Sequence, residues 1–340
     1  MAARVTVKTC AAFADPALPG LTAALDLPRV ESMLRGARNA NGQPFAVTGV
    51  ELVAHKPGQR CVLRYTLKPL DGTLRAQQTL IAKLYNRRRL AARVFDVMLA
   101  LWRRPFNGRS FRIPEPLGHN AELGILFQED VRGRDLRELL GTPQADTALR
   151  LTAAWLRQLH HAPPSENLRD CIPRHEIEKA HSWSDALIRA NAHWRTQIEF
   201  LVERLTGQSW IGEPIPRVPI HRDFYYAHVL IAGCQLIVLD FDTLALGDSL
   251  FDLGHFWGHL VARASADQSA LYTPDAQTFL SAYGVERDSR AFARIASYAA
   301  LTCLKLAFTL CQRKLPELWT KGELLLKQAD RFLQSVTSDQ

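Results

Sequence analysis

The sequence predicts an α+β fold with two lobes: a small N-terminal lobe built on an antiparallel sheet, and a larger helical C-terminal lobe. The first observation is a group of three strand-like runs between about residues 47 and 85, in which apolar and polar residues alternate. The second is the helical periodicity of most of the chain beyond about residue 135. The third is a pair of short apolar strands within 218–242. Strands and helices in separate blocks of the chain are typical of α+β proteins.

Composition and turn signals define the strands of the small lobe. Lys56-Pro57-Gly58-Gln59 predicts a turn between the first two strands, and Asp71-Gly72 predicts a tight hairpin between the second and third. A further buried strand is expected over 125–131 (ILFQEDV). The three consecutive runs are VTGVELVAH (47–55), RCVLRYTLK (60–68) and LRAQQTLIAKLY (74–85).

Helical patterns account for most of the remaining chain. A helix over 87–102 ends before Pro105. In the larger lobe, helices are expected over 145–161, 174–206, 274–283, 287–313 and 316–335, and the two short strands of 218–242 flank a turn at Gly233. The predicted division of the chain is an N-terminal helical extension (1–40), an N-lobe (41–131) and a helical C-lobe (132–340).

The composition excludes several classes of protein. With 47% hydrophobic and 22% charged residues, the chain is neither disordered nor fibrous. No apolar run approaches the roughly 20 residues of a membrane span, so no membrane association is expected. The six cysteines lie far apart and form no C-x-x-C pair, which indicates neither a disulfide framework nor a zinc site. A reducing, cytoplasmic location is therefore predicted.

The net charge of +8 raises the alternative of a nucleic-acid binder. Arginines cluster at 87–89 and recur at 93, 103 and 104, but Phe95, Leu99 and Trp102 lie at helical spacing among them. This pattern favours an amphipathic helix with a solvated basic face. No specific nucleic-acid partner is therefore expected.

Two carboxylates at the ends of the predicted hairpin carry the strongest chemical signal. Asp223 follows His221-Arg222 just before the hairpin, and Asp240 lies at its far end. Because a hairpin returns its two ends to the same place, both carboxylates can face one point. A phosphoryl-transfer site needs such a pair, one to orient and deprotonate an attacking hydroxyl and one to hold magnesium against phosphates.

This stretch resembles the aminoglycoside phosphotransferase and choline kinase superfamily, a branch of the protein-kinase-like fold. His221-Arg222-Asp223 matches the H-R-D motif of its relatives, and Asp240-Phe241-Asp242 stands where they carry D-F-G. The resemblance spans roughly residues 45–310 and implies a bilobal protein-kinase-like fold, with Asp223 and His221 as catalytic residues and Asp240 as a metal ligand. Asp248 and Asp252, in a segment similar to the family's next motif, are expected to brace the catalytic loop by hydrogen bonds.

The resemblance also implies ATP and Mg²⁺ as cofactors. In the turn after the first strand, Lys56, Gly58 and Arg60 would lie over the ATP. Lys83 occupies the strand position of the family's phosphate-binding lysine. Backbone groups near Glu129 and Val131 would bind the adenine.

Two departures from the family pattern leave alternatives open. His228 stands where the family usually has an asparagine that binds a second magnesium, and imidazole suits magnesium poorly. His228 is either a metal ligand or a core histidine bonded to Asp240. The helix over 87–102 lacks a glutamate to pair with Lys83, so either Asp96 serves or the partner lies elsewhere.

The predicted function is ATP- and Mg²⁺-dependent phosphorylation of a hydroxyl on a small molecule, sugar-like or amino-alcohol- and aminoglycoside-like, by a monomer or homodimer. The alternative is a catalytically degenerate kinase-fold module that binds a nucleotide or other ligand. A cationic acceptor would require an acidic pocket. Five acids either supply such a pocket or belong to an exposed helix face: Glu166, Asp170, Glu176, Glu178 and Asp185.

Overall fold

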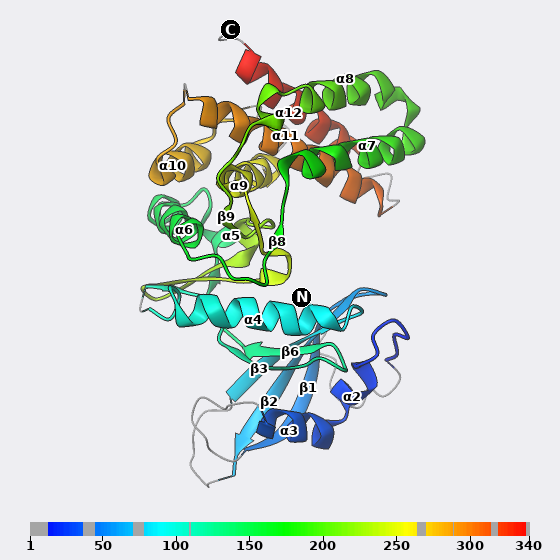
Figure 1. Cartoon of the computed structure of the whole chain (residues 1–340), viewed down its shortest axis with the longest axis vertical. Coiled ribbons are helices and arrows are strands. Elements are labelled where there is room, and N and C mark those ends of the chain that lie inside the picture. The colour runs from blue at the N-terminus through cyan, green and yellow to red at the C-terminus, as the bar shows by residue number, and fades with distance from the viewer. Residues whose placement is uncertain are drawn as a thin grey trace. The chain divides into compact units, whose positions relative to one another are not determined.

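The computed structural model describes residues 13–36, 45–70, 78–108, 110–263, 270–287, 289–313 and 319–337 (Figure 1). The chain divides into a sheet unit, Met1–Arg132 with Ile237–Asp242, and a helical unit, Gly133–Leu236 with Thr243–Gln340. The predicted α+β class, with an antiparallel sheet first and a helical part second, is confirmed. The proposed boundaries at 40 and 131 stay a prediction. The assignment of 237–242 to the sheet unit was not anticipated, and it places Asp240 there.

The sheet unit contains a five-stranded antiparallel sheet in the order β1-β2-β3-β6-β5. Helix α4 packs on β3, β5 and β6, and α3 packs on β1 (Figure 1). The bounds are β1 Phe45–Lys56, β2 Arg60–Pro69, β3 Gln78–Tyr85, β5 Pro116–Asn120, β6 Ile125–Glu129, α2 Leu21–Leu25, α3 Leu27–Gly36 and α4 Arg89–Arg103, with the short strand β4 at Phe111–Arg112.

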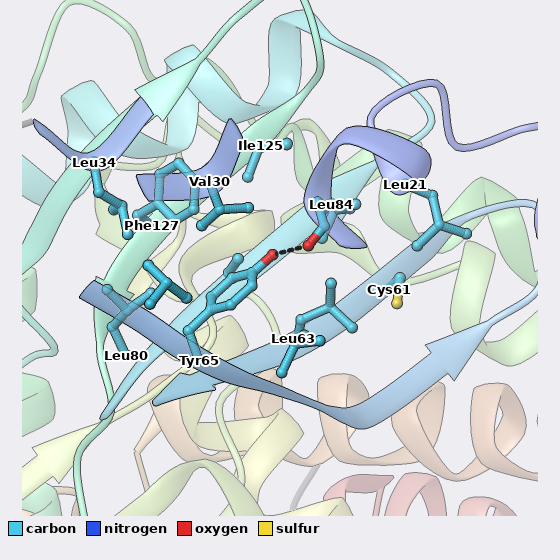
Figure 2. Close-up of a cluster of buried hydrophobic side chains, with 14 of the residues drawn as sticks. Leu21, Val30, Leu34, Cys61, Leu63, Tyr65, Leu80, Leu84, Ile125 and Phe127 are labelled. Carbon is cyan, nitrogen blue, oxygen red and sulfur yellow. Dashed lines mark hydrogen bonds between the residues drawn. The ribbon is translucent and has the colours of Figure 1, made fainter. Parts of the chain in front are cut away.

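Side chains alternate between the two faces of this sheet, and the two faces have different surroundings. Cys61, Leu63 and Tyr65 of β2 are fully buried in an apolar core with α2 and α3, and the Tyr65 hydroxyl donates to the backbone oxygen of Ala24 at 2.6 Å (Figure 2). Successive side chains point to opposite faces of a strand. Residues between these core positions therefore project from the other face, where the candidate site is built.

The helical unit is built from long helices and short strands. Its strands β8, β12 and β9 form a three-stranded sheet, and β7 pairs with β10. The helices are α5 Leu136–Leu139, α6 Ala145–His160, α7 Pro173–Ala190, α8 Arg195–Thr206, α9 Ser249–Arg263, α10 Pro274–Tyr283, α11 Arg290–Cys311 and α12 Trp319–Thr337. The strands are β7 Arg134–Asp135, β8 Arg169–Asp170, β9 Val218–Ile220, β10 Val229–Ala232 and β12 Ala245–Gly247. Strand β11, Gln235–Val238, includes the point in the chain where the sheet unit resumes.

Helices α9 and α11 form the centre of the helical unit. A methyl group placed on Gly254 of α9 would lie 2.4 Å from the Tyr298 side chain and 2.6 Å from the Ile295 backbone oxygen of α11. Gly258 is similarly crowded by Thr302. The two helices thus approach more closely than larger side chains would allow. In the described part of the chain, α11 is the one helix long and apolar enough to cross a membrane, but 67% of its most apolar window is buried, as in a core helix.

The secondary structure departs from expectation in several places. The single helix predicted over 174–206 is two helices, because Asn191 adopts an extended conformation after α7 and its side chain caps a short 3₁₀ turn at Ala192–Trp194. Strand β5 was missed, and so was α9, whose largely buried sequence obscures helical periodicity. The hairpin turn predicted at Asp71-Gly72 lies outside the described residues.

Candidate active site

The sheet unit carries a cluster of opposite charges built around two aspartates. The Lys83 ammonium donates to Asp240 Oδ1 at 2.7 Å and to Asp242 Oδ1 at 3.0 Å. Arg60 donates to Asp240 Oδ2 at 3.1 Å and to Asp242 Oδ2 at 3.0 Å. The Tyr85 hydroxyl donates to Asp242 Oδ1 at 2.7 Å. Two carboxylates are therefore held by two cations and a phenol.

Strand geometry explains this cluster. Arg60 lies opposite Tyr85 in the β2–β3 ladder, and Val62 lies opposite Lys83, so these side chains share the face that looks away from the α2–α3 core. Asp240 has a positive φ of 65°, a backbone conformation that costs a non-glycine residue on the order of 1–3 kcal/mol and is concentrated at functional sites.

The electrostatics of the cluster keep its cations charged. Burial alone would lower the pKa of Lys83, which is 7% exposed, but Asp242 and Asp240 raise that pKa above its ordinary value. Burial and the neighbouring Asp242 raise the pKa of Tyr85 well above its ordinary value, so Tyr85 acts as a neutral donor. The acidic partners of Lys83 are Asp240 and Asp242. They form the ion pair with Lys83 for which Asp96 was considered.

The donor set of the cluster suits magnesium. Mg²⁺ prefers oxygen ligands and is commonly held by one or two carboxylates completed by water and phosphate oxygens. Asp240 and Asp242 offer such carboxylates side by side. Among the described residues, no group of three or more histidine, cysteine, aspartate or glutamate side chains is arranged to hold a metal by itself.

The turn between β1 and β2 is anchored from the N-terminal segment. Gly58 has a positive φ of 70°, which favours glycine, and its N–H donates to Asp15 Oδ2 at 2.8 Å. His55 lies 2.9 Å from the same carboxylate oxygen. The hydrogen bond from Gly58 and the neighbouring His55 lower the pKa of Asp15. Lys56 begins this turn, because the Gln59 N–H donates to its backbone oxygen.

Glu129 and Val131 lie where the sheet ends. Glu129 is the last residue of β6, and Val131 is in the irregular segment that follows. The Glu129 carboxylate pairs with Arg112 at 2.8 Å, and the backbone N–H of Glu129 donates to the backbone oxygen of Glu115. The Glu129 side chain is thus committed to a local ion pair and its backbone N–H to Glu115, and the adenine contact stays a prediction.

The helical unit holds Asp223 in a polar environment of its own. Asp223 Oδ1 lies 3.2 Å from His255 Nε2 and 3.4 Å from the Lys305 ammonium. Burial opposes ionisation, but His255 and Lys305 hold the pKa of Asp223 below its ordinary range, so its carboxylate is charged at neutral pH. His228 Nδ1 lies 2.8 Å from the Asp223 backbone oxygen, and since a carbonyl only accepts, that nitrogen carries a proton. Whether His228 also binds metal stays a prediction.

Asp252 fixes the loop that carries Asp223. Its two carboxylate oxygens accept the backbone N–H groups of His221 and Arg222, each at 2.7 Å. His160 Nε2 lies 3.2 Å from Asp252 Oδ2. Arg222 has a positive φ of 68°, so these bonds hold a backbone conformation that a non-glycine residue rarely adopts. The hydrogen bonds expected between Asp252 and this loop are therefore present.

Two further residues that were expected to act here, Asp248 and His221, are buried. Asp248 accepts hydrogen bonds from the Leu250 N–H and the Tyr298 hydroxyl and pairs with Arg294 at 3.0 Å, so it joins α9 to α11 instead of bracing the catalytic loop. The His221 ring is fully buried, in edge-on contact with Phe224. The catalytic role expected of His221 stays a prediction.

A cavity of about 150 Å³ opens beside Asp223 within the helical unit. Helices α7, α9 and α11 supply most of its wall. Its charged and aromatic lining includes Glu176, Lys179, Trp183, Arg222, Asp223 and Lys305. The cavity gives the candidate base a space in which a small molecule can bind.

Comparison with known proteins identifies the class. The sequence model of the phosphotransferase enzyme family matches residues 71–294, more than half of the chain. The chain belongs to this family, and the expected enzyme class, a small-molecule kinase with an alcohol group as acceptor, is confirmed. No curated protein sequence matches the chain significantly.

Solved structures share the fold at low sequence identity. Spectinomycin phosphotransferase APH(9)-Ia, in complex with ADP and spectinomycin, is 12% identical with a TM-score of 0.57, covering 92% of this chain and 97% of its own. A candidate aminoglycoside phosphotransferase from Ralstonia eutropha is 15% identical with a TM-score of 0.62, covering 90% and 97%. Choline kinase LicA from Streptococcus pneumoniae is 16% identical with a TM-score of 0.52, covering 85% and 94%. At these identities the similarity establishes the fold.

Proposed function

We propose that the protein transfers the γ-phosphate of ATP, bound with Mg²⁺, to a hydroxyl group of a small molecule. The observation that carries this proposal is the Asp223 carboxylate at the edge of a cavity, with Lys305 and His255 beside it. An ionised carboxylate within reach of a bound hydroxyl can accept its proton. The ADP in the similar spectinomycin phosphotransferase supports a nucleotide as the phosphate donor.

Asp223 acts on the acceptor in this proposal. It orients the acceptor hydroxyl and takes its proton as the new O–P bond forms; the bond between the γ-phosphorus and the bridging oxygen breaks, and ADP leaves with that electron pair.

The sheet unit supplies the groups that would bind the nucleotide. Lys83 and Arg60 neutralise phosphate charge, and Lys56 and the Gly58 turn cover the phosphates. Magnesium, held by Asp240 with Asp242 beside it, would supply further neutralisation of phosphate charge. Backbone groups of Glu129 and Val131 would hold the adenine.

His221 has a structural part in this proposal. Its ring is fully buried, and it does not line the cavity in which the acceptor would bind. His221 therefore contributes by fixing the loop, and Asp223 is the group that takes the proton.

The test is ATP consumption by purified protein with Mg²⁺, against a panel of sugars, amino sugars, aminoglycosides and choline-like alcohols. Turnover with one acceptor class is expected, with a fall of at least about 100-fold in both Asp223→Asn and Asp240→Ala. Near-normal turnover by Asp240→Ala would remove the metal assignment. A full rate in Asp223→Asn would remove the assignment of the base.

One observation favours the alternative of a catalytically degenerate nucleotide-binding module. Arg60 and Lys83 already neutralise both carboxylates of the proposed metal site. A module of this kind would gain thermal stability from ATP and consume none with any acceptor.

For either function we propose a cytoplasmic location, a monomeric or homodimeric state, and no specific nucleic-acid partner. Among the described residues, the five cysteines form no disulfide bond.

A further inference from the structure

The cavity beside Asp223 carries an excess of positive charge. Among the described residues that line it, Lys179, Arg222 and Lys305 are cationic, and Glu176 and Asp223 are anionic. Burial lowers the pKa of His255, the remaining titratable residue of the described wall, and so favours its neutral form. An acceptor that enters this space meets more positive than negative charge.

Glu176, the one acid of the described wall besides Asp223, is fully engaged by cations. Lys179 donates to both of its carboxylate oxygens, at 2.7 and 2.6 Å, and Arg222 donates to Oε1 at 2.7 Å. Burial opposes ionisation, but Arg222 and Lys179 hold the pKa of Glu176 below its ordinary value. This carboxylate therefore has little capacity left to bind an ammonium group of an acceptor.

Lys305 is the cation best placed to bind an acceptor. It projects from α11 beside Asp223, at 3.4 Å, and its side chain remains 39% exposed. An ammonium has three N–H donors, so one contact with Asp223 leaves donors for a ligand. A carboxylate or phosphate group on the acceptor would form charge-assisted hydrogen bonds there, whereas an acceptor ammonium would be repelled.

The remaining wall suits a small carbon skeleton. The half-buried Trp183 stacks on Phe308 with ring centroids 6.3 Å apart and presents an aromatic surface to the cavity. The volume of about 150 Å³ lies below the roughly 300–1,000 Å³ typical of pockets for drug-sized ligands. The space fits a small compound or one ring of a larger one.

We propose that the phosphate acceptor is a hydroxylated compound with an anionic group, a carboxylate or a phosphate, that binds Lys305 within this cavity. The proposal rests on the proposed phosphotransferase function and narrows its substrate class. It argues against a cationic acceptor such as an aminoglycoside or an amino alcohol.

The experiment compares acceptors that share a hexose ring and differ in charge: glucosamine, glucose, glucuronate and glucose 6-phosphate. ATP consumption with Mg²⁺ is measured for the wild type, Lys305→Met and Lys305→Arg, with background hydrolysis subtracted. The matched control is Lys327→Met on α12, whose lysine pairs with Glu323 at 2.7 Å and does not line the cavity. Thermal unfolding of each variant establishes that it is folded.

The wild type is expected to use an anionic hexose with a lower KM than glucose and glucosamine. Lys305→Met should raise KM for the anionic acceptor by roughly 10- to 100-fold and leave KM for glucose nearly unchanged, since charge-assisted hydrogen bonds are of that strength. Lys305→Arg should restore much of the affinity, and Lys327→Met should match the wild type. The relative KM values of glucuronate and glucose 6-phosphate distinguish a carboxylate from a phosphate ester.

Other outcomes separate the two levels of the proposal. Preference for glucosamine, or an equal rise in KM for charged and neutral acceptors in Lys305→Met, would overturn the anionic-acceptor inference while the phosphotransferase function stands. If Lys305→Met does not fold, the KM values of the wild type for the four hexoses test the anionic-acceptor inference by themselves. Absence of turnover with these hexoses and with the wider panel would contradict the phosphotransferase function itself.

Discussion

The backbone N–H of Arg222 donates at 2.7 Å to Asp252, thirty residues further along the chain. The adjacent N–H of His221 donates to the other oxygen of the same carboxylate. One buried side chain of α9 thus holds two successive backbone groups of the loop before Asp223. The position of the candidate base therefore depends on α9.

Replacement of Asp252 by asparagine should impair both stability and turnover. The amide retains one oxygen acceptor, so at least one buried N–H of the loop loses its partner, at about 1–3 kcal/mol. A displaced loop should also lower kcat by about 100-fold, with little change in the KM for nucleotide. Denaturant unfolding and steady-state kinetics measure these effects.

The matched control for this variant is Asp170→Asn, because Asp170 pairs with Arg217 at the surface. The free energy of unfolding of Asp170→Asn should stay within about 0.5 kcal/mol of the wild-type value. Equal effects of the two substitutions would show that Asp252 does not support the loop.

Arg60→Gln should bind divalent metal more tightly in the absence of nucleotide. The guanidinium contacts both Asp240 and Asp242 and competes with a metal ion for their oxygens. Because Arg60 is 41% exposed, solvent screening limits the gain to about 2- to 5-fold. Titration with Mn²⁺, followed by the loss of free Mn²⁺ signal in electron paramagnetic resonance, measures this affinity without any activity.

Arg64→Gln on the same strand is the control, since Arg64 pairs with Glu51 and Asp130 and contacts neither Asp240 nor Asp242. Weaker Mn²⁺ binding in Arg60→Gln than in the wild type would argue against competition at these carboxylates.

Asp15→Asn should release the turn at Gly58. The carboxylate accepts the Gly58 N–H and contacts His55, and the asparagine lacks the charge that strengthens both contacts. Hydrogen exchange of the backbone N–H groups of residues 58–60 should become faster, and the KM for nucleotide should rise with kcat unchanged. Unchanged exchange in this segment would show that Asp15 does not anchor the turn.

The same anchor predicts a direction of pH dependence. The pKa of Asp15 is lowered in the folded chain, first by the Gly58 hydrogen bond and then by His55. Its stabilising effect is therefore fully present above the ordinary carboxyl pKa of 3.8 and is lost as the pH falls through the lower, folded value. Protection of the Gly58 N–H, corrected for intrinsic exchange, should persist from pH 6 to about pH 4. Loss of protection already near pH 6 would contradict this assignment.

Gly254→Ala should destabilise the helical unit by about 1–3 kcal/mol, the usual cost of overpacking. The added methyl would meet backbone and side-chain atoms of α11 at 2.4–2.9 Å, closer than real Cβ contacts come. Gly212→Ala is the control, because a methyl there meets nothing within 4 Å. Denaturant unfolding followed by circular dichroism measures both, and equal stabilities would contradict the close approach of α9 and α11.

The sequence by itself determined the α+β class and the strands that carry Arg60 and Lys83, and it predicted the site aspartates at positions 223 and 240. These features are readable because alternation, turn residues and short motifs are local properties of the chain. Only the tertiary structure decided how the charges are paired. Asp15 reaches Gly58 across 43 residues, Lys83 reaches Asp242 across 159, and Lys305 reaches Asp223 across 82. A local pattern cannot specify such pairs, since an aspartate or lysine reads the same in the sequence whether it faces solvent or a buried partner of opposite charge.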